Sequence, residues 1–269
     1  MEIVPFTPAE VPAFLALATA EGWVCDPWEF SFLLGTFPRG CLAGMIDGRP
    51  VAFVTALKHG TGGWVGNLIV APGSRGKGAG PGLMARALAA LQAAGADTVW
   101  LTASEAGRPI YEKMGFREID VITRWTGEGR GTGEVTPAPA GPDALAAADR
   151  AGWGDDRSAL LAAVAQRGMV LTSPGGSLVL QPCAGSIQIG PWGGAPPDGA
   201  AELLQQARAT VPAGTRIVLD APVRNIAAAR IFAAAGFTVC GRNSLMFAGI
   251  TPAYRPELIY ALASMGSMG

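Results

Sequence analysis

The sequence predicts a mixed α/β fold built as two lobes of similar size. Segments patterned like strands and helices alternate along the chain, which favours a mixed sheet with helices on both faces. A Gly/Pro-rich stretch, Gly127–Pro142, divides the chain near its middle. Related segments recur on either side of it, most clearly Ile110–Phe116 (IYEKMGF) and Ile231–Phe237 (IFAAAGF). The 269 residues suffice for two domains of ordinary size.

These observations predict the domain boundaries. We expect a first lobe at residues 1–128, a linker at 129–142 and a second lobe at 143–269 that ends in a helix. A weaker likeness between Glu21–Leu34 and Ala151–Val164 occurs in the same order as the clearer one. Two related pairs in the same order favour an internal duplication.

The elements of the first half follow from periodicity and turn signals. Asp26 is expected to cap a helix whose first turn contains Pro27. Asp47–Pro50 (DGRP) is typical of a turn between antiparallel strands. The expected strands are 2–6, 41–47, 49–60, 63–72, 98–103 and 116–125, and the expected helices are Pro8–Gly22, Pro27–Phe37, Gly78–Ala94 and 107–115.

The second half repeats the later part of this order. The expected strands are 185–192, 215–220 and 237–247, and the expected helices are 197–209, Asn225–Ala235 and an amphipathic helix at 252–265.

Composition excludes several classes of function. The formal net charge is −1, so no surplus of Lys and Arg favours nucleic acid or an anionic membrane as a partner. A single histidine excludes a multi-histidine metal site, and no C-x-x-C motif joins the four cysteines, so we expect no metal. The chain has no apolar run long enough for a membrane span and no basic start before an apolar run. We therefore expect a cytoplasmic protein.

The junction Ile69–Leu88 (IVAPGSRGKGAGPGLMARAL) carries the chemistry. Glycines at 76, 78 and 80 stand where an apolar strand meets a helix. Glycine permits φ > 0 and close approach, so the free N–H groups of the helix start can turn toward one ligand. The helix dipole and the side chains of Arg75 and Lys77 add positive charge. The junction therefore predicts a cradle for a phosphate group, although a glycine-rich turn with solvated charges has the same composition.

Two common phosphate motifs do not fit the junction. The Walker A pattern fails because Gly78 follows Lys77 and position 71 is alanine, and the dinucleotide pattern G-x-G-x-x-G fails at Pro81 or Leu83. The pattern that fits is R-x-x-G-x-G, Arg75–Gly80.

At this point the chain resembles the GNAT superfamily of acyl-CoA-dependent N-acetyltransferases. The resemblance rests on Leu68–Val70 at the strand end, on Arg75–Gly80 at the helix start, and on Tyr111–Phe116 (YEKMGF) about 30 residues later. It covers residues 1 to about 125 well, and in the second half only Asn225–Phe237. A two-lobed bacterial subgroup, which includes an acyltransferase for the antibiotic precursor holothin, is similar in its doubled layout. The resemblance implies two tandem lobes, each a mostly antiparallel sheet flanked by helices.

The resemblance also implies a cofactor site. Acetyl-CoA would place its diphosphate on the amides of the glycine loop, and its extended arm would pair with the strand edge. The implied cofactor-binding residues are Leu68, Ile69, Val70, Arg75, Gly76, Lys77, Gly78, Ala79, Gly80, Ser104 and Tyr111. Ser104 stands seven residues before Tyr111, where the family often has an asparagine. A strand N–H at Leu68 or Ile69 would stabilise the oxyanion.

Two catalytic side chains are implied. Tyr111, with an ordinary pKa of ~10 against ~8.5 for a thiol, can protonate the departing thiolate; its alternative role is an aromatic packed on an amphipathic helix. A base must take a proton from the attacking ammonium, and we assign Glu29. Asp26, His59 and Glu105 remain alternatives.

The second half departs from the family pattern. Phe232 stands where the tyrosine would be, and the junction Ile189–Leu204 has no Arg or Lys, carries Asp198, and has prolines at 196 and 197 that remove N–H groups. We expect a degenerate lobe that has lost cofactor binding.

The function implied is transfer of an acetyl group from acetyl-CoA to a primary amine of a small molecule, by a monomer or homodimer. The alternative is a CoA-binding sensor or pseudoenzyme without chemistry.

Overall fold

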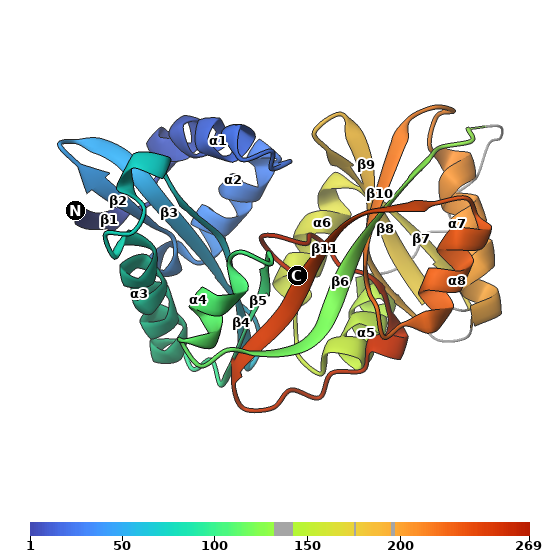
Figure 1. The fold of residues 1–269 in the computed structure, drawn as a ribbon. Helices are drawn as coiled ribbons and strands as arrows, with labels where there is room; N and C mark the ends of the chain where they lie inside the picture. The colour runs from blue at the N-terminus through green and yellow to red at the C-terminus, as the bar shows by residue number, and fades with distance from the viewer. Residues whose placement is uncertain (132–141, 175, 195–196) are drawn as a thin grey trace. The chain divides into compact units, whose positions relative to one another are not determined.

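The computed structural model describes residues 1–131, 142–174, 176–194 and 197–269 (Figure 1). These residues form two compact units. The first unit contains Met1–Leu101 with two short later segments, Phe247–Ile250 and Gly266–Met268. The second unit contains Thr102–Met246, Thr251–Met265 and Gly269. The boundaries expected from the sequence remain predictions, and most of the expected linker lies outside the described residues.

The first unit begins with a strand, two helices and an antiparallel meander, followed by a β-α-β step. Its elements are β1 (Glu2–Pro5), η1 (Pro8–Glu10), α1 (Val11–Ala20), α2 (Pro27–Thr36), η2 (Pro38–Gly40), β2 (Leu42–Ile46), β3 (Arg49–Lys58), β4 (Gly62–Val70), η3 (Pro72–Ser74), α3 (Ala79–Ala93) and the start of β5 (Thr98–Ala103). Strands β1 to β4 are antiparallel neighbours, and β4 pairs in parallel with β5. Helices α1 and α2 contact β3, and α3 contacts β3 and β4; Figure 1 draws α3 on the other side of this sheet.

Local signals explain where these elements begin and end. The side chain of Asp26 accepts a hydrogen bond from Trp28 N (2.9 Å) at the start of α2, as its sequence predicts. Asp47 and Gly48 both have positive φ, 50° and 72°, which is the turn geometry that matches the twist of a hairpin. The turn between β2 and β3 is therefore confirmed.

Aromatic side chains form much of the core between β3 and the first two helices. The rings of Phe14 and Phe30 lie 4.6 Å apart between centroids, and those of Phe6 and Phe53 lie 4.9 Å apart. All four side chains are at most 3% exposed. Such rings bury large apolar areas and interlock in tilted pairs, so they fix α1 and α2 against the sheet.

The second unit has the same order of an antiparallel meander followed by a β-α-β step. Its elements are α4 (Arg108–Glu112), β6 (Arg117–Glu128), α5 (Pro142–Trp153), α6 (Ser158–Arg167), β7 (Met169–Ser173), β8 (Gly176–Cys183), β9 (Ser186–Gly194), α7 (Pro197–Thr210), β10 (Arg216–Pro222), α8 (Ile226–Ala234), β11 (Thr238–Gly249), η4 (Pro256–Leu258) and β12 (Ile259–Ala261). Its strand order is β11-β6-β10-β9-β8-β7, with β12 on β9. Strands β9 and β10 pair in parallel, whereas β6 with β10, β7 with β8, β8 with β9 and β9 with β12 are antiparallel. The predicted mixed and mostly antiparallel fold is confirmed.

A buried ion pair fixes the register of β6 against β10. Arg124 and Asp220 are cross-strand partners, and the guanidinium donates from Nε (2.7 Å) and Nη2 (2.8 Å) to the two carboxylate oxygens. Gln188 adds a third hydrogen bond at 3.1 Å. Burial would lower the pKa of Arg124, but the hydrogen bonds and charge of Asp220 raise it overall. A shift of one residue would leave the fully buried carboxylate without this partner, which is costly.

The expected C-terminal helix is wrong. Residues 256–258 form a 3₁₀ turn, and Ile259–Ala261 pairs with β9 as strand β12. The periodicity at 252–265 indicated a helix because apolar residues recur there. In the folded unit those residues form a continuous buried run, Ile259–Ser264, and a run of that kind also suits a short strand covered on both faces.

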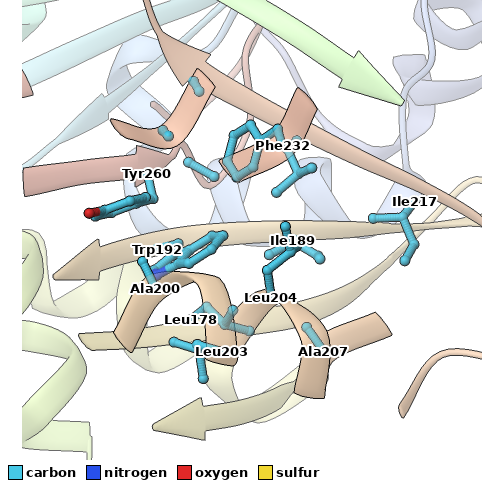
Figure 2. Close-up of a cluster of buried hydrophobic side chains, with 14 of the residues drawn as sticks. Leu178, Ile189, Trp192, Ala200, Leu203, Leu204, Ala207, Ile217, Phe232 and Tyr260 are labelled. Atoms are coloured by element: carbon cyan, nitrogen blue, oxygen red, sulfur yellow. The ribbon is translucent and has the colours of Figure 1, made fainter. Parts of the chain in front are cut away.

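The core of the second unit is a cluster of apolar side chains between α7, α8 and the sheet (Figure 2). Phe232 is fully buried, with its ring centroid 5.9 Å from that of Trp192. Trp192 stacks on Tyr260 at 5.0 Å. Phe232, which stands where the resemblance implies a tyrosine, is thus a core residue.

Truncating this side chain tests its packing role. Phe232→Ala is expected to lower the free energy of unfolding by about 3–5 kcal/mol, because removing a buried ring leaves a cavity. Ile226→Ala is the control, since Ile226 lies on the same helix but is 62% exposed, and it should cost below about 0.5 kcal/mol. Denaturant unfolding measures both; equal losses would contradict the core assignment.

Candidate functional site

Strand β4 is paired with β5 along only part of its length. Among the described residues, the register with β5 includes only Gly62–Trp64 of β4. On its other side, β4 remains paired with β3 as far as Val70. Residues 65–70 therefore have an edge that β5 does not pair, and such an edge can bind an extended ligand through backbone groups.

A bulge lies within this part of β4. The register with β3 shifts between Phe53↔Ile69 and Thr55↔Gly66, which places one extra residue in β4. Asn67 adopts a left-handed φ of 55°, and its side chain donates to Thr55 Oγ1 at 3.1 Å. Bulges re-aim the backbone groups next to them. Leu68, which follows, is partly exposed, so its N–H is a suitable candidate for the oxyanion donor.

The C-terminal segment Gly266–Met268 lies in the same unit, against the middle of β4. A Cβ on Gly66 would lie 2.4 Å from the carbonyl oxygen of Gly266 and 2.7 Å from Ser267 Cα. The close backbone approach requires glycine at position 66. The sequence contains no signal for this contact between segments 200 residues apart.

The glycine loop has the geometry of an anion cradle. Gly76 and Gly78 adopt φ of 75° and 80°, and Gly78 caps α3 with no side-chain hydrogen bond. Residues 75–78 are exposed. Within the described part of the chain, the N–H groups of Gly76, Gly78, Ala79 and Gly80 donate no hydrogen bond. Free amides at the positive end of a 15-residue helix, the first of them on exposed residues, fit a phosphate group.

The two basic side chains of the loop are held in place. Arg75 Nε donates to Val70 O (2.9 Å), and Arg75 Nη2 lies 2.5 Å from Glu21 Oε1. Lys77 Nζ donates to Gly73 O at 2.9 Å. The structure thus brings the end of β4 and the loop together, as the sequence predicted, and adds Glu21, which sequence reasoning missed.

The candidate bases lie in different surroundings. Glu29 is in the first turn of α2 and is 9% exposed. The carboxylate of Asp26 accepts the capping hydrogen bond of that helix. Glu29 stays our predicted base, and Asp26, His59 and Glu105 stay the alternatives.

Ser104 and Tyr111 belong to the second unit, where both flank Gly107. Ser104 Oγ accepts a hydrogen bond from Gly107 N (3.2 Å), and a Cβ on Gly107 would lie 3.4 Å from Tyr111 Cε2. Burial raises the pKa of Tyr111 to about 12. Its hydroxyl has no hydrogen-bond partner among the residues that the structure describes. The phenol is therefore protonated at neutral pH and has a proton to donate.

The corresponding asparagine of the second half is a structural residue. Asn225 Oδ1 accepts from Ala228 N (2.9 Å) at the start of α8, and Asn225 Nδ2 donates to Ile259 O (2.8 Å). These contacts hold β12 and α8 together. Residues 195 and 196 of the glycine-rich junction lie outside the described residues.

Residues 12–116 match the sequence model of the acetyltransferase (GNAT) family. This segment is therefore similar to GNAT acetyltransferases. The match includes the end of β4, the glycine loop and Tyr111. No curated protein matches the chain in sequence.

Solved structures share the fold over nearly the whole chain. A presumed acetyltransferase from Pyrococcus horikoshii has a TM-score of 0.86 and 20% identity, over 99% of this chain and 95% of its own. A GCN5-related N-acetyltransferase from Sphaerobacter thermophilus has a TM-score of 0.66 and 20% identity, over 93% and 96%. Eis1 from Mycobacterium abscessus has a TM-score of 0.55 and 18% identity, over 93% and 74%. At these identities the likeness concerns the fold alone.

Two kinds of feature are absent from the described residues. They contain no cluster of three or more His, Cys, Asp or Glu placed to hold a metal ion. None of the helices in the described ranges has the length and apolar character needed to cross a membrane.

Proposed function

We propose that the protein transfers an acetyl group from acetyl-CoA to a primary amine of a small molecule. One observation carries the proposal: the GNAT-matched segment has unpaired amides at the start of α3, directly beside the edge of β4 that no strand of the described residues pairs. The first feature suits a diphosphate, and the second suits the extended, amide-rich arm attached to it. Both occur in one unit.

The residues present fit this co-substrate. The amides of Gly76, Gly78, Ala79 and Gly80 would hold the diphosphate, and Arg75 would add a charge-assisted donor. Neither Gly76 nor Gly78 has a heavy atom within 4 Å of the position its Cβ would take. The loop therefore has room for a ligand on this side.

Bound acetyl-CoA supplies the thioester whose acetyl group is transferred. The N–H of Leu68 would stabilise negative charge on the thioester oxygen while the amine nitrogen bonds to the carbonyl carbon and the C–S bond breaks. Tyr111 would give its proton to the departing sulfur, since its raised pKa keeps it protonated. Glu29 would take the proton that the amine loses.

The net charge of the protein supports a small amine as the acceptor. A formal net charge of −1 offers no general attraction to nucleic acid. The CoA-binding sensor without chemistry is the competing function.

The test combines binding and turnover. Calorimetry should show CoA binding by the whole chain, and release of free thiol from acetyl-CoA should rise with at least one of a panel of amines, amino acids, polyamines and aminoglycosides. Binding without turnover across the panel would favour the sensor. Absence of binding would contradict both functions.

A further inference from the structure

The inference concerns Glu21, and it rests on the proposed function. Glu21 is the residue that ends α1, 54 residues before Arg75 in the sequence, and both belong to the first unit. Its Oε1 lies 2.5 Å from Arg75 Nη2. Arg75 also donates from Nε to Val70 O at 2.9 Å. Two of the three guanidinium nitrogens are thus engaged, and Nη1 has no partner among the residues described.

The position of Glu21 is electrostatically unfavourable without a cation. The C-terminus of a helix carries a partial negative charge, which repels a carboxylate. The last turn of α1 contains no basic residue. Arg75 therefore supplies the nearby positive charge that compensates both the helix end and the carboxylate.

The same arginine is the loop residue best suited to a diphosphate. A guanidinium binds carboxylate and phosphate oxygens with the same planar geometry. The side chains of Arg75 and Glu21 are 49% and 34% exposed, so the pair is accessible to solvent and to an incoming anion. A phosphate at the free amides of Gly76 to Gly80 would compete with Glu21 for one cation.

We infer that Glu21 is the resident counter-ion of Arg75 and that it sets the affinity of the glycine loop for the phosphate groups of CoA by competing with them. Glu21 weakens the binding of CoA, and its carboxylate no longer contacts the guanidinium when the diphosphate occupies the loop. Glu21 thus acts on the ligand through Arg75, as a competitor for its guanidinium.

The experiment is a double-mutant cycle on the full chain, with the Kd for CoA measured by calorimetry at low salt. Glu21→Gln preserves the shape of the side chain and removes its charge. It should lower the Kd about 2- to 5-fold, the range expected for loss of an exposed ion pair. Glu2→Gln is the matched control, since it removes an exposed carboxylate from β1 of the same unit, and it should leave the Kd unchanged.

The second arm tests whether Glu21 acts through Arg75. In an Arg75→Gln background, Glu21→Gln should have no further effect on the Kd, because the shared cation is gone. The gain in affinity for CoA in the Glu21→Gln variant should also be smaller at high salt, where the Debye length falls to a few ångströms.

The measured Kd values decide between the inference and its alternatives. An unchanged or raised Kd in Glu21→Gln overturns the inference, as does a gain that persists without Arg75. If the unmodified protein fails to bind CoA at all, the proposed function fails first. Thermal unfolding of every variant identifies any loss of folding.

Discussion

Replacing Tyr111 by phenylalanine is expected to lower kcat about 10²-fold, while the Kd for CoA changes less than twofold. A positioned general acid typically contributes about 10²–10⁴-fold to the rate. Phenylalanine keeps the ring that packs edge-on against Phe116, with centroids 6.1 Å apart, but has no proton to donate. Steady-state release of free thiol from acetyl-CoA, with the best amine of the panel, measures the effect.

The pH profile provides the control for this variant. Burial raises the pKa of Tyr111 to about 12, so the phenol stays protonated through pH 7–10 and should cause no loss of activity in that range. Any fall in kcat there belongs to another group and should also appear in the phenylalanine variant. An unchanged kcat in Tyr111→Phe would remove the acid role and leave Tyr111 as a packing residue.

Replacing Gly78 by valine is expected to raise the Kd for CoA at least about tenfold, which corresponds to about 1.4 kcal/mol. Gly78 caps α3 with a φ of 80°. A residue other than glycine costs roughly 1–2 kcal/mol in this left-handed region of φ, and a β-branched residue is rarely found there. The loop should rearrange and withdraw the amides from the ligand.

Gly73→Val is the matched control. Gly73 lies in the turn before the same loop, also has open space around its Cβ position, and has no positive φ. It should keep the Kd within about twofold. Equal losses at the two positions would mean that the loop responds to bulk rather than to backbone geometry.

The sequence predicted the elements around the site because their signals are local. The cap at Asp26, the turn at Asp47–Gly48 and the glycine-to-helix junction at 76–80 depend on neighbours within a few residues. For this reason α2, the hairpin of β2 and β3, and α3 all begin and end within two residues of the expected bounds.

The second unit was predicted less completely. Strands β7 and β8 and helices α5 and α6 have no counterpart among the elements expected from the sequence. Strand β12 was mistaken for a helix. The recurrence of apolar residues at 252–265 suits a helix as well as a buried strand, and pairing with β9 decides the conformation.

For the site, the motif identified the loop and the end of β4, which are continuous in sequence. Three other features depend on residues far apart: the bulge at Asn67 is defined against β3, Gly66 faces Gly266, and Arg75 meets Glu21. None of these has a local signal, since each depends on which segments the fold brings together.

The sequence by itself determined that a mixed α/β chain presents a glycine-rich, positively charged helix start, because backbone freedom and the helix dipole are properties of neighbouring residues. Only the tertiary structure decided which carboxylate shares Arg75, where β4 becomes unpaired, and that the C-terminal residues form a strand. These outcomes depend on burial and on contacts between distant segments, which arise only when the chain has folded.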